Sequence, residues 1–270
     1  MTTPVLSLQL YTIRPALEAD QQGALERVKA LGIDNVEAFG FVGRAGELRG
    51  ALDSAGLTAR SGHASFISDE VRFGGQVMQV PPFEQTLDEA EALGLEYLID
   101  PMTSPDHWAS RDGVAALAER MNTAAAQAAQ RGIRVGYHNH SQEFHHSFDG
   151  VCAYEAFVAL LDDSVALELD AYWAQVGGQD LTALSTRLGD RLKALHVKDG
   201  TVGVDPFRTG EFDPVALGQV PAGLGEVALD AVLNAATALE LAVVEFDHYE
   251  GDIFDGIAGT VGYLAERGIR

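Results

Sequence analysis

Segments of two kinds alternate along the chain, and glycine marks many of the junctions between them. Segments with apolar residues at helical spacing end just before Gly32, Gly56, Gly94 and Gly132, and a short apolar run follows each glycine. Glycine adopts the left-handed conformation that commonly ends a helix, at little steric cost. Leu239–Leu241 forms a similar junction without glycine. The pattern predicts repeated helix-to-strand transitions, with short strands typical of a parallel sheet covered by helices.

We expect eight strands separated by helices. The predicted strands are Val5–Tyr11, Asn35–Phe39, Thr58–His63, Tyr97–Ile99, Arg134–Asn139, Val165–Asp170, Leu192–Val197 and Ala242–Phe246. The predicted helices are Gly23–Leu31, Ala45–Ala55, Phe83–Leu93, Val114–Arg131, Tyr154–Leu161, Leu181–Leu188, Leu229–Leu239 and Ile253–Arg267. Eight alternations without a central linker favour a closed (β/α)₈ TIM barrel, which commonly has about 250 residues in one domain. Residues 1–270 are therefore expected to form a single α/β barrel domain. A dinucleotide-binding sheet is not favoured, because no G-x-G-x-x-G motif follows the first strand.

Two of the predicted connections are long. Ala64–Pro82 follows the third strand, and Asp199–Val227 follows the seventh. Both leave the carboxyl ends of strands, where barrel enzymes carry their active sites. We therefore expect these two segments to cover a site.

Composition restricts the partners of the protein. The chain has 40 acidic and 18 basic residues, a formal net charge of −22. Such a surface repels nucleic acid and anionic membranes, so a small molecule is the expected partner. Cys152 is the single cysteine, which fits a reducing compartment. With no apparent signal peptide and no apolar run of about 18 residues, the expected location is cytoplasmic.

Ionisable residues gather where the predicted strands end. They are Glu37 on the second strand, His63 on the third, His138 to Glu143 on the fifth, Asp170 on the sixth, His196 and Lys198 on the seventh, and Glu245 on the eighth. Ionisable groups inside a ring of apolar strands are costly unless they are paired or bind a metal. Carboxylates with a histidine suit Mn²⁺, Mg²⁺, Co²⁺ or Zn²⁺. The pattern predicts one divalent metal ion, with buried ion pairs as the alternative.

Short motifs along nearly the whole chain resemble one known family. They are Leu8–Arg14, Val36-Glu37, His138–Phe144, Leu169–Trp173 followed by Gly177-Gly178, His196–Asp199 and Val244-Glu245. In this order and spacing they resemble the sugar phosphate isomerase/epimerase family of xylose isomerase-like TIM barrels. That group also contains inosose dehydratases and endonuclease IV-type enzymes. The resemblance is more specific for the family than for a substrate.

The resemblance implies a ligand set for the metal, in which Mn²⁺ is the favoured ion. Position by position, the ligands are Glu143, Asp170, His196 and Glu245. One departure concerns the fifth strand, where many members have Glu-Asn-His and this chain has His138-Asn139-His140. The branch with His-Asn-His usually has a glutamate three residues later, which Glu143 matches, and it includes inosose dehydratases and enzymes that act on keto-sugars. His138 or His140 remains an alternative ligand.

The family chemistry is the removal of a proton next to a carbonyl, with a metal-stabilised enediolate. By resemblance, Glu143 and Glu245 act as acid and base. His138 and His140 are alternative bases, because an unperturbed histidine has a pKa of about 6.5. We therefore expect an isomerase or epimerase of a sugar or keto-sugar. A lyase of the inosose dehydratase or keto-glycoside-cleaving type is the alternative, since it uses the same first step.

Further residues are candidates for contact with the substrate. Glu37, His63 and Lys198 offer polar groups, and the aromatic candidates for stacking on a sugar are Trp173, Phe66 and Trp108. The structural alternatives are a Glu37–His63 pair, a Lys198 ion pair, and core packing of Phe66 and Trp108. Few basic residues lie near the strand ends, so a sugar, keto-sugar or cyclitol without phosphate is favoured. A homodimer or homotetramer is common in the family.

Two other classes of function are less favoured. A DNA-repair endonuclease of this family needs a basic surface and several metals, which the net charge of −22 opposes. A non-catalytic sugar-binding barrel does not need candidate bases beside the metal ligands.

Overall fold

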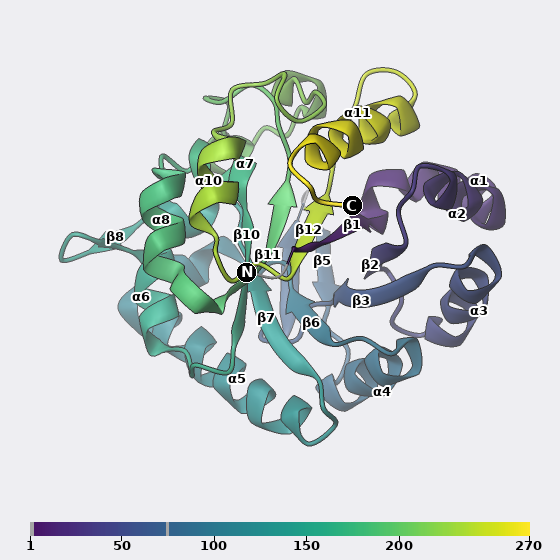
Figure 1. Ribbon diagram of the computed structural model, residues 1–270. Coiled ribbons are helices and arrows are strands. Elements are labelled where there is room, and N and C mark those ends of the chain that lie inside the picture. The colour runs from purple at the N-terminus through teal and green to yellow at the C-terminus, as the bar shows by residue number, and fades with distance from the viewer. Residues whose placement is uncertain (1–2, 74–75) are drawn as a thin grey trace.

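In the computed structural model, eight parallel strands of the described residues close into a barrel surrounded by helices (Figure 1). The structure describes residues 3–73 and 76–270. Each strand pairs with the next barrel strand along the chain, and the last pairs with the first. The barrel strands are β1 (Val5–Gln9), β2 (Asn35–Phe39), β3 (Thr58–His63), β6 (Tyr97–Asp100), β7 (Arg134–His138), β10 (Ala166–Asp170), β11 (Leu192–Val197) and β12 (Leu241–Val244). The predicted (β/α)₈ barrel is therefore confirmed.

Two strands end earlier than predicted, because side chains capture the backbone at their carboxyl ends. The side chain of Gln9 accepts a hydrogen bond from the Tyr11 backbone N–H, and Leu10–Ile13 then forms a 3₁₀ helix. At the end of β12, the Phe246 N–H donates to the Thr12 hydroxyl instead of to a neighbouring strand. Both departures redirect the chain at the same end of the barrel.

The predicted helices are present, several with the predicted bounds. They are α2 (Gln21–Ala30), α3 (Ala45–Ala55), α4 (Phe83–Leu93), α5 (Arg111–Ala129), α6 (Ala153–Leu160), α8 (Leu181–Leu188), α10 (Leu229–Ala235) and α11 (Ile253–Glu266). Gly56 and Gly94 end α3 and α4 with φ of 69° and 78°, as the glycine pattern predicts. Short helices that were not predicted follow two of the barrel strands: α1 (Arg14–Ala19) comes after β1 and α7 (Ala171–Val176) after β10. The Asp170 carboxylate begins α7 by accepting from the Trp173 N–H.

The two long connections contain structure of their own. The connection after β3 carries the hairpin of β4 (Glu70–Phe73) and β5 (Gln76–Gln79), and residues 74 and 75 lie outside the described residues. The connection after β11 contains α9 (Pro206–Thr209) and a 3₁₀ helix, Pro214–Leu217. A further hairpin, β8 (Ser147–Phe148) with β9 (Val151–Cys152), precedes α6.

Apolar side chains pack inside the amino-terminal half of the barrel and in the space between the strands and the helices. Inside the barrel, one cluster comprises Tyr97, Ile99, Ala166, Ala194, Leu241 and Val243. A larger cluster packs the outer faces of the strands against the helices, with Leu8, Val36 and Leu195 fully buried. Nearer the amino-terminal end, the uncharged side chains of Asn35 and Ser7 are buried and hydrogen-bonded to each other, at 2.9 Å.

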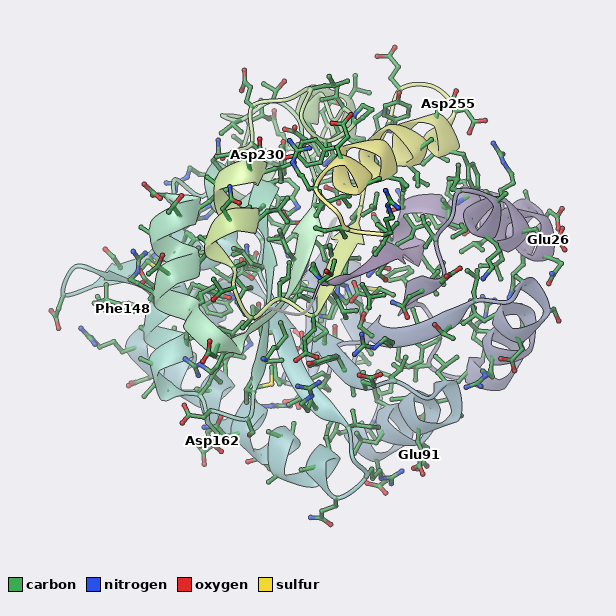
Figure 2. All side chains as sticks on the ribbon, in the orientation of Figure 1. Glu26, Glu91, Phe148, Asp162, Asp230 and Asp255 are labelled. Atoms are coloured by element: carbon green, nitrogen blue, oxygen red, sulfur yellow. The ribbon has the colours of Figure 1, made fainter. Side chains whose placement is uncertain are left out.

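Much of the acidic charge lies on the outside of the molecule. Exposed carboxylates include Glu26 on α2, Glu91 on α4, Asp162 after α6 and Asp255 on α11 (Figure 2). Within the described residues, no helix is long and apolar enough to cross a membrane. The cytoplasmic location stays a prediction.

The buried carboxylate of Asp199 fixes the connection that follows β11. It accepts backbone hydrogen bonds from Gly200 and Val227 on Oδ1 and from Gly223 and Gly225 on Oδ2, at 2.8 to 3.0 Å. A carboxylate can satisfy these four donors because both of its oxygens only accept. Asp199 thus joins the two ends of the connection.

We predict that Asp199→Asn lowers the free energy of unfolding by about 2–4 kcal/mol, because the amide NH₂ would face two backbone donors that lose their acceptor. Denaturant unfolding followed by circular dichroism measures this. Asp213→Asn is the control, since Asp213 accepts a single hydrogen bond, from Val215, at an exposed turn. Equal stability of the Asp199 variant and the wild type would contradict the assigned role.

Candidate functional site

The candidate site is built from pairs of side chains two residues apart on neighbouring strands. Alternate residues of a strand point to the same face, so each pair places one group lower in the barrel and one nearer its mouth. The pairs are Gln9 and Tyr11, Glu37 and Phe39, His138 and His140, Glu168 and Asp170, His196 and Lys198, and Glu245 and Asp247. The strand register aligns them, since Gln9 lies beside Glu37 and Asp170 beside His196.

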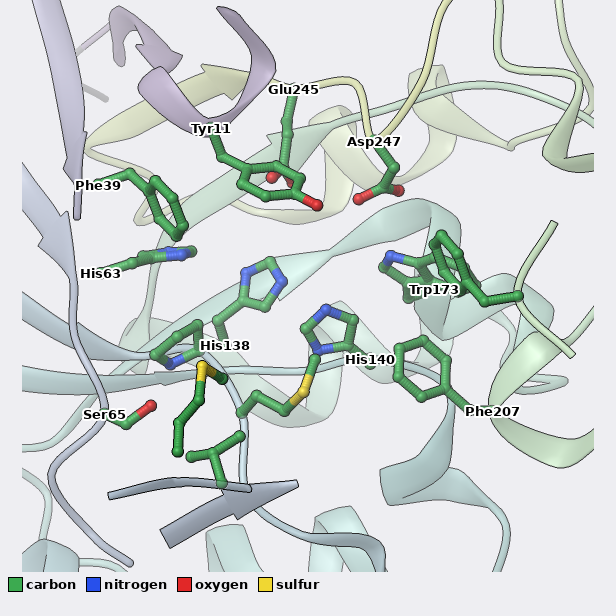
Figure 3. Close-up of a pocket in the computed structure, with 15 residues that line it drawn as sticks. Tyr11, Phe39, His63, Ser65, His138, His140, Trp173, Phe207, Glu245 and Asp247 are labelled. Carbon is green, nitrogen blue, oxygen red and sulfur yellow. The ribbon is translucent and has the colours of Figure 1, made fainter. Parts of the chain in front are cut away.

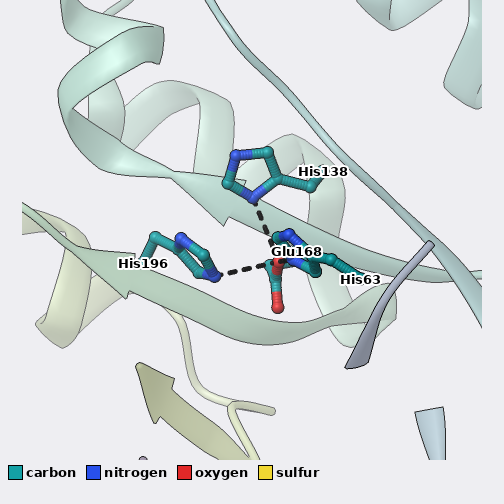
Figure 4. A group of neighbouring side chains, drawn as sticks. All are labelled: His63, His138, Glu168 and His196. Atoms are coloured by element: carbon teal, nitrogen blue, oxygen red, sulfur yellow. Dashed lines mark hydrogen bonds and ion pairs between the residues drawn. The ribbon is translucent and has the colours of Figure 1, made fainter. Parts of the chain in front are cut away.

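The lower layer is a network of two carboxylates, Glu37 and Glu168, and three histidines; Figure 4 shows Glu168 among His63, His138 and His196. Glu168 Oε1 lies 2.6 Å from His63 Nε2 and 3.0 Å from both His138 Nδ1 and His196 Nε2. Glu37 Oε1 lies 3.0 Å from His63 Nε2 and 2.8 Å from His196 Nε2. The His63 and His196 rings are stacked, with centroids 5.3 Å apart. These contacts bring together residues from five strands, β2, β3, β7, β10 and β11.

Mutual attraction outweighs the cost of burying these charges. Burial by itself lowers the pKa of His63, but the carboxylates of Glu37 and Glu168 raise it to about 10. Burial and the charge of Glu37 act to raise the pKa of Glu168, yet His196 and His63 hold it at about 2. The pKa of His138 instead falls well below its usual value, because of burial and the neighbouring His196. The network therefore holds protonated His63 and His196 and a neutral His138.

The upper layer is organised around the ammonium group of Lys198. Lys198 Nζ lies 3.0 Å from Asp170 Oδ2, 2.8 Å from Glu245 Oε2 and 3.0 Å from Asp247 Oδ2. Burial acts to lower the pKa of Lys198, but the three carboxylates hold it well above its usual value. Burial raises the pKa of Asp170 to about 6 despite Lys198. Glu245 stays ionised, because Lys198 and His196 overcome the effect of burial and hold its pKa well below the usual range.

Four buried residues at the junction of the two layers could hold a divalent metal ion. His138, Asp170, His196 and Glu245 each offer one ligand atom, and these atoms lie within 4.8 Å of one another. Two imidazole nitrogens and two carboxylate oxygens suit Mn²⁺, Co²⁺ or Zn²⁺. Asp170 Oδ2 is buried and accepts no hydrogen bond from the described residues; its ion-pair contacts are Lys198 Nζ at 3.0 Å and His138 Nε2 at 3.8 Å. The residues present therefore fit a metal ion.

A second group of the same kind is made by His63, His138, Glu168 and His196. In this group Glu168 Oε1 already bonds to His63 and His138 in the lower network, whereas Glu168 Oε2 accepts no hydrogen bond from the described residues. The second group lies below the first group, by the alternation of residues along β10 and β11. The first group is the better candidate, since it supplies two carboxylates, Asp170 and Glu245, whereas the second group supplies one.

Glu143 is held apart from both groups. It lies on the 3₁₀ helix Gln142–Phe144, where its carboxylate accepts from the Tyr137 hydroxyl at 2.8 Å and from the His140 backbone N–H at 2.9 Å. Burial raises its pKa to about 7. In this geometry Glu143 fixes the turn that carries His140, and among the described residues His138 offers the candidate ligand atom on β7. Direct ligation by Glu143 stays a prediction.

A pocket of about 230 Å³ opens above these layers (Figure 3). It is lined by Tyr11, Phe39, His63, Ser65, Val71, Met78, Pro101, Met102, His138, His140, Trp173, Phe207, Phe212, Glu245 and Asp247. His140 packs between Trp173 and Phe207, with ring centroids 6.0 and 5.1 Å away. Burial and the charge of Lys198 lower the pKa of His140 to about 3, so its imidazole is neutral.

The remaining sequence candidates lie at different depths. His63 and Trp173 border the pocket, whereas Glu37 and Lys198 lie beneath it, within the two charged layers. Trp108 is fully buried and packs against Tyr137 and Phe157, with its indole N–H donating to Thr103.

Phe66 is also buried and does not border the pocket. Its ring packs on Phe83, and its backbone N–H donates to Asp100. The structure thus gives Trp108 and Phe66 the core positions that were the structural alternative.

Some pocket residues were missed at the sequence level. Asp247 carried a usable signal, since it lies two residues after Glu245 and strand alternation places both on one face. Tyr11 carried the same signal relative to Gln9. Phe207 and Met78 carried none, because loop and hairpin residues have no periodic relation to the strand ends.

The fold is similar to that of several solved enzymes. A sugar phosphate isomerase/epimerase from Parabacteroides distasonis has a TM-score of 0.77 and 21% identity, with 98% of each chain covered. The probable 3-DHS dehydratase AsbF from Bacillus anthracis has a TM-score of 0.71 and 13% identity, covering 97% of this chain and 99% of that one. A D-allulose 3-epimerase from Methylomonas sp. has a TM-score of 0.69 and 15% identity, with 99% of each chain covered. At these identities the likeness concerns the fold.

Sequence comparison identifies the family. No curated protein matches the chain. A sequence model of the family described as xylose isomerase-like TIM barrel matches residues 25–257, which is most of the chain. With the closed barrel and the buried histidine–carboxylate group at its carboxyl-terminal end, this match shows that the protein belongs to the xylose isomerase-like TIM barrel family.

Proposed function

We propose that the protein is a divalent-metal-dependent isomerase or epimerase that moves a proton on a carbon next to the carbonyl group of a sugar or keto-sugar. The observation that carries this proposal is the buried group of His138, Asp170, His196 and Glu245, with ligand atoms within 4.8 Å of one another at the floor of a pocket. Sugar isomerases and epimerases among the solved neighbours support a sugar as the substrate class.

A bound divalent ion would polarise the substrate carbonyl and stabilise negative charge on its oxygen. His138, Asp170, His196 and Glu245 would hold it, with Mn²⁺ favoured. The lower network supports this arrangement, because Glu37 and Glu168 fix the ring of His196 through its Nε2 atom. Such hydrogen-bonded partners orient the imidazoles that bind metals.

Glu245 is the strongest candidate for the base. It is ionised and borders the pocket, and its Oε2 atom is held by His196 at 2.6 Å and Lys198 at 2.8 Å. A carboxylate fixed in this way can accept a proton without first reorienting. His140 is the candidate for the second proton-transfer group, since it also borders the pocket and its Nδ1 atom bonds to none of the described residues.

Other residues would bind and orient the substrate. His63 is protonated and borders the pocket, so it can donate to a substrate hydroxyl. Trp173 borders the pocket and would contact the substrate there. Lys198 would keep Glu245 and Asp247 in place from below. Elimination of a substituent would begin with the same proton removal, and product analysis separates it from epimerisation.

We predict that Glu245→Gln slows exchange of the carbon-bound proton by about 10²–10⁴-fold, because the amide cannot accept a proton as the carboxylate does. Proton NMR in deuterated water, with Mn²⁺ present and a panel of keto-sugars, measures the exchange. Glu250→Gln is the matched control at an exposed position. Unchanged exchange in the Glu245 variant would remove it from the mechanism.

The ligand supplied by β7 can be tested separately. We expect His138→Asn to weaken Mn²⁺ binding by about 100-fold or more. We expect Glu143→Gln to leave the metal content near that of the wild type and to lower the thermal stability of the protein. Elemental analysis and Mn²⁺ titration followed by electron paramagnetic resonance measure the binding. His146→Asn is the control at an exposed position. Metal loss with Glu143→Gln, but not with His138→Asn, would assign the ligand to Glu143.

A further inference from the structure

The pocket has a polar floor and an apolar outer wall. His63, His138, His140, Glu245 and Asp247 provide ionisable groups at the strand ends. The outer wall comes from Phe39, Val71, Met78, Pro101, Met102 and Phe212, which belong to the end of β2, the β4–β5 hairpin, the segment after β6 and the connection after β11. Ser65 is the polar side chain among the described residues beside this wall.

Part of this apolar wall is exposed to solvent. Phe39 is 42% exposed, Met78 is 50% exposed and Phe212 is 43% exposed, although all three border the same pocket. Large apolar side chains that gather around a cavity usually mark a binding surface, because leaving them in water is unfavourable. Their common position at the pocket indicates that they contact a ligand.

The wall has a rigid aromatic edge. Phe39 meets the ring of Tyr11 edge to face at 5.0 Å. The guanidinium of Arg14 covers the Tyr11 ring, 3.8 Å from its centroid, and Arg14 also donates to the Tyr11 carbonyl. Figure 3 shows Phe39 and Tyr11 on one side of the pocket and Phe207 on the other. A fixed aromatic edge of this kind suits a flat apolar group.

Charge and hydrogen bonding narrow the class of ligand. The lining that the structure describes contains no lysine or arginine, and Glu245 and Asp247 place negative charge at the floor. An anionic substituent such as phosphate that lay against the outer wall would therefore have no cationic partner among the wall residues that the structure describes. A free sugar carries hydroxyl groups on all sides, and those facing the apolar wall would lose their hydrogen bonds to water.

We propose that the pocket takes a sugar or keto-sugar that carries an uncharged aromatic substituent. The sugar ring lies at the floor, beside His63, His140 and Asp247, and the substituent lies against Phe39, Met78 and Met102. The position of the sugar rests on the proposed function, whereas the aromatic subsite rests on the wall itself. The residue that sets the preference is Phe39.

Binding of paired glycosides tests this proposal. Isothermal titration calorimetry compares phenyl with methyl β-D-glucopyranoside, and repeats the comparison for the galacto and xylo pairs, with and without Mn²⁺. We expect the phenyl member of at least one pair to bind about tenfold or more tightly, because it buries an additional apolar ring. Phe39→Ser and Met78→Ser should each weaken binding of the phenyl member more than binding of the methyl member, and so remove most of this preference.

Leu224→Ser is the matched control, since Leu224 is 75% exposed and does not border this pocket. Equal affinity within every pair, including absence of binding, would overturn the proposal. Loss of self-association in Phe39→Ser without loss of the phenyl preference would overturn the role of Phe39 and assign it to a subunit interface.

The binding readout also separates this proposal from the proposed function. A phenyl preference that depends on Phe39, with no proton exchange on any sugar, supports the aromatic subsite and contradicts the isomerase. Proton exchange on free sugars, with no preference within any pair, contradicts the subsite and leaves the isomerase standing.

Discussion

The upper half of the barrel depends on the mutual neutralisation of charges that are buried together. Glu37 and Glu168 lie between His63 and His196, and one layer higher Lys198 lies among three carboxylates. Any one of these groups alone would be expelled from the barrel or would lose its charge, because the desolvation of an isolated ion costs several kcal/mol or more. Interleaved, they hold the side chains of six strands in one geometry.

This arrangement holds the ionisable side chains of the site in fixed positions. The lower layer fixes the rings of the histidines, and the upper layer fixes Glu245 and Asp247 through Lys198. Above them, the connections after β3 and β11 bring apolar side chains over the charged floor. The pocket therefore combines a floor of ionisable side chains with an apolar wall. Its shape depends on Asp199, whose carboxylate ties the connection after β11 to the end of that strand.

Much of the site could be predicted because strand alternation is regular. Asp170 and His196 lie near the carboxyl ends of β10 and β11, as predicted, and Glu245 directly follows β12. The structure brings one ligand atom of each within 4.8 Å of the others. The pattern did not specify the position of Glu143, because the chain leaves β7 in a 3₁₀ turn where the period of two is lost. It also could not separate Trp108, in the core, from Trp173, at the pocket, since both are aromatic residues near strand ends.

The sequence by itself determined the family, the order of strands and helices, and the end of the barrel at which the chemistry lies. These features follow from local periodicity, from glycine at helix ends, and from the rule that parallel strands bring their carboxyl ends together. Only the tertiary structure decided that His138 meets Asp170, that Lys198 joins three carboxylates and that Phe39 and Met78 border one pocket. The physical reason is that these contacts join segments far apart in sequence, and their distances are set by barrel closure and loop packing, which no local pattern encodes.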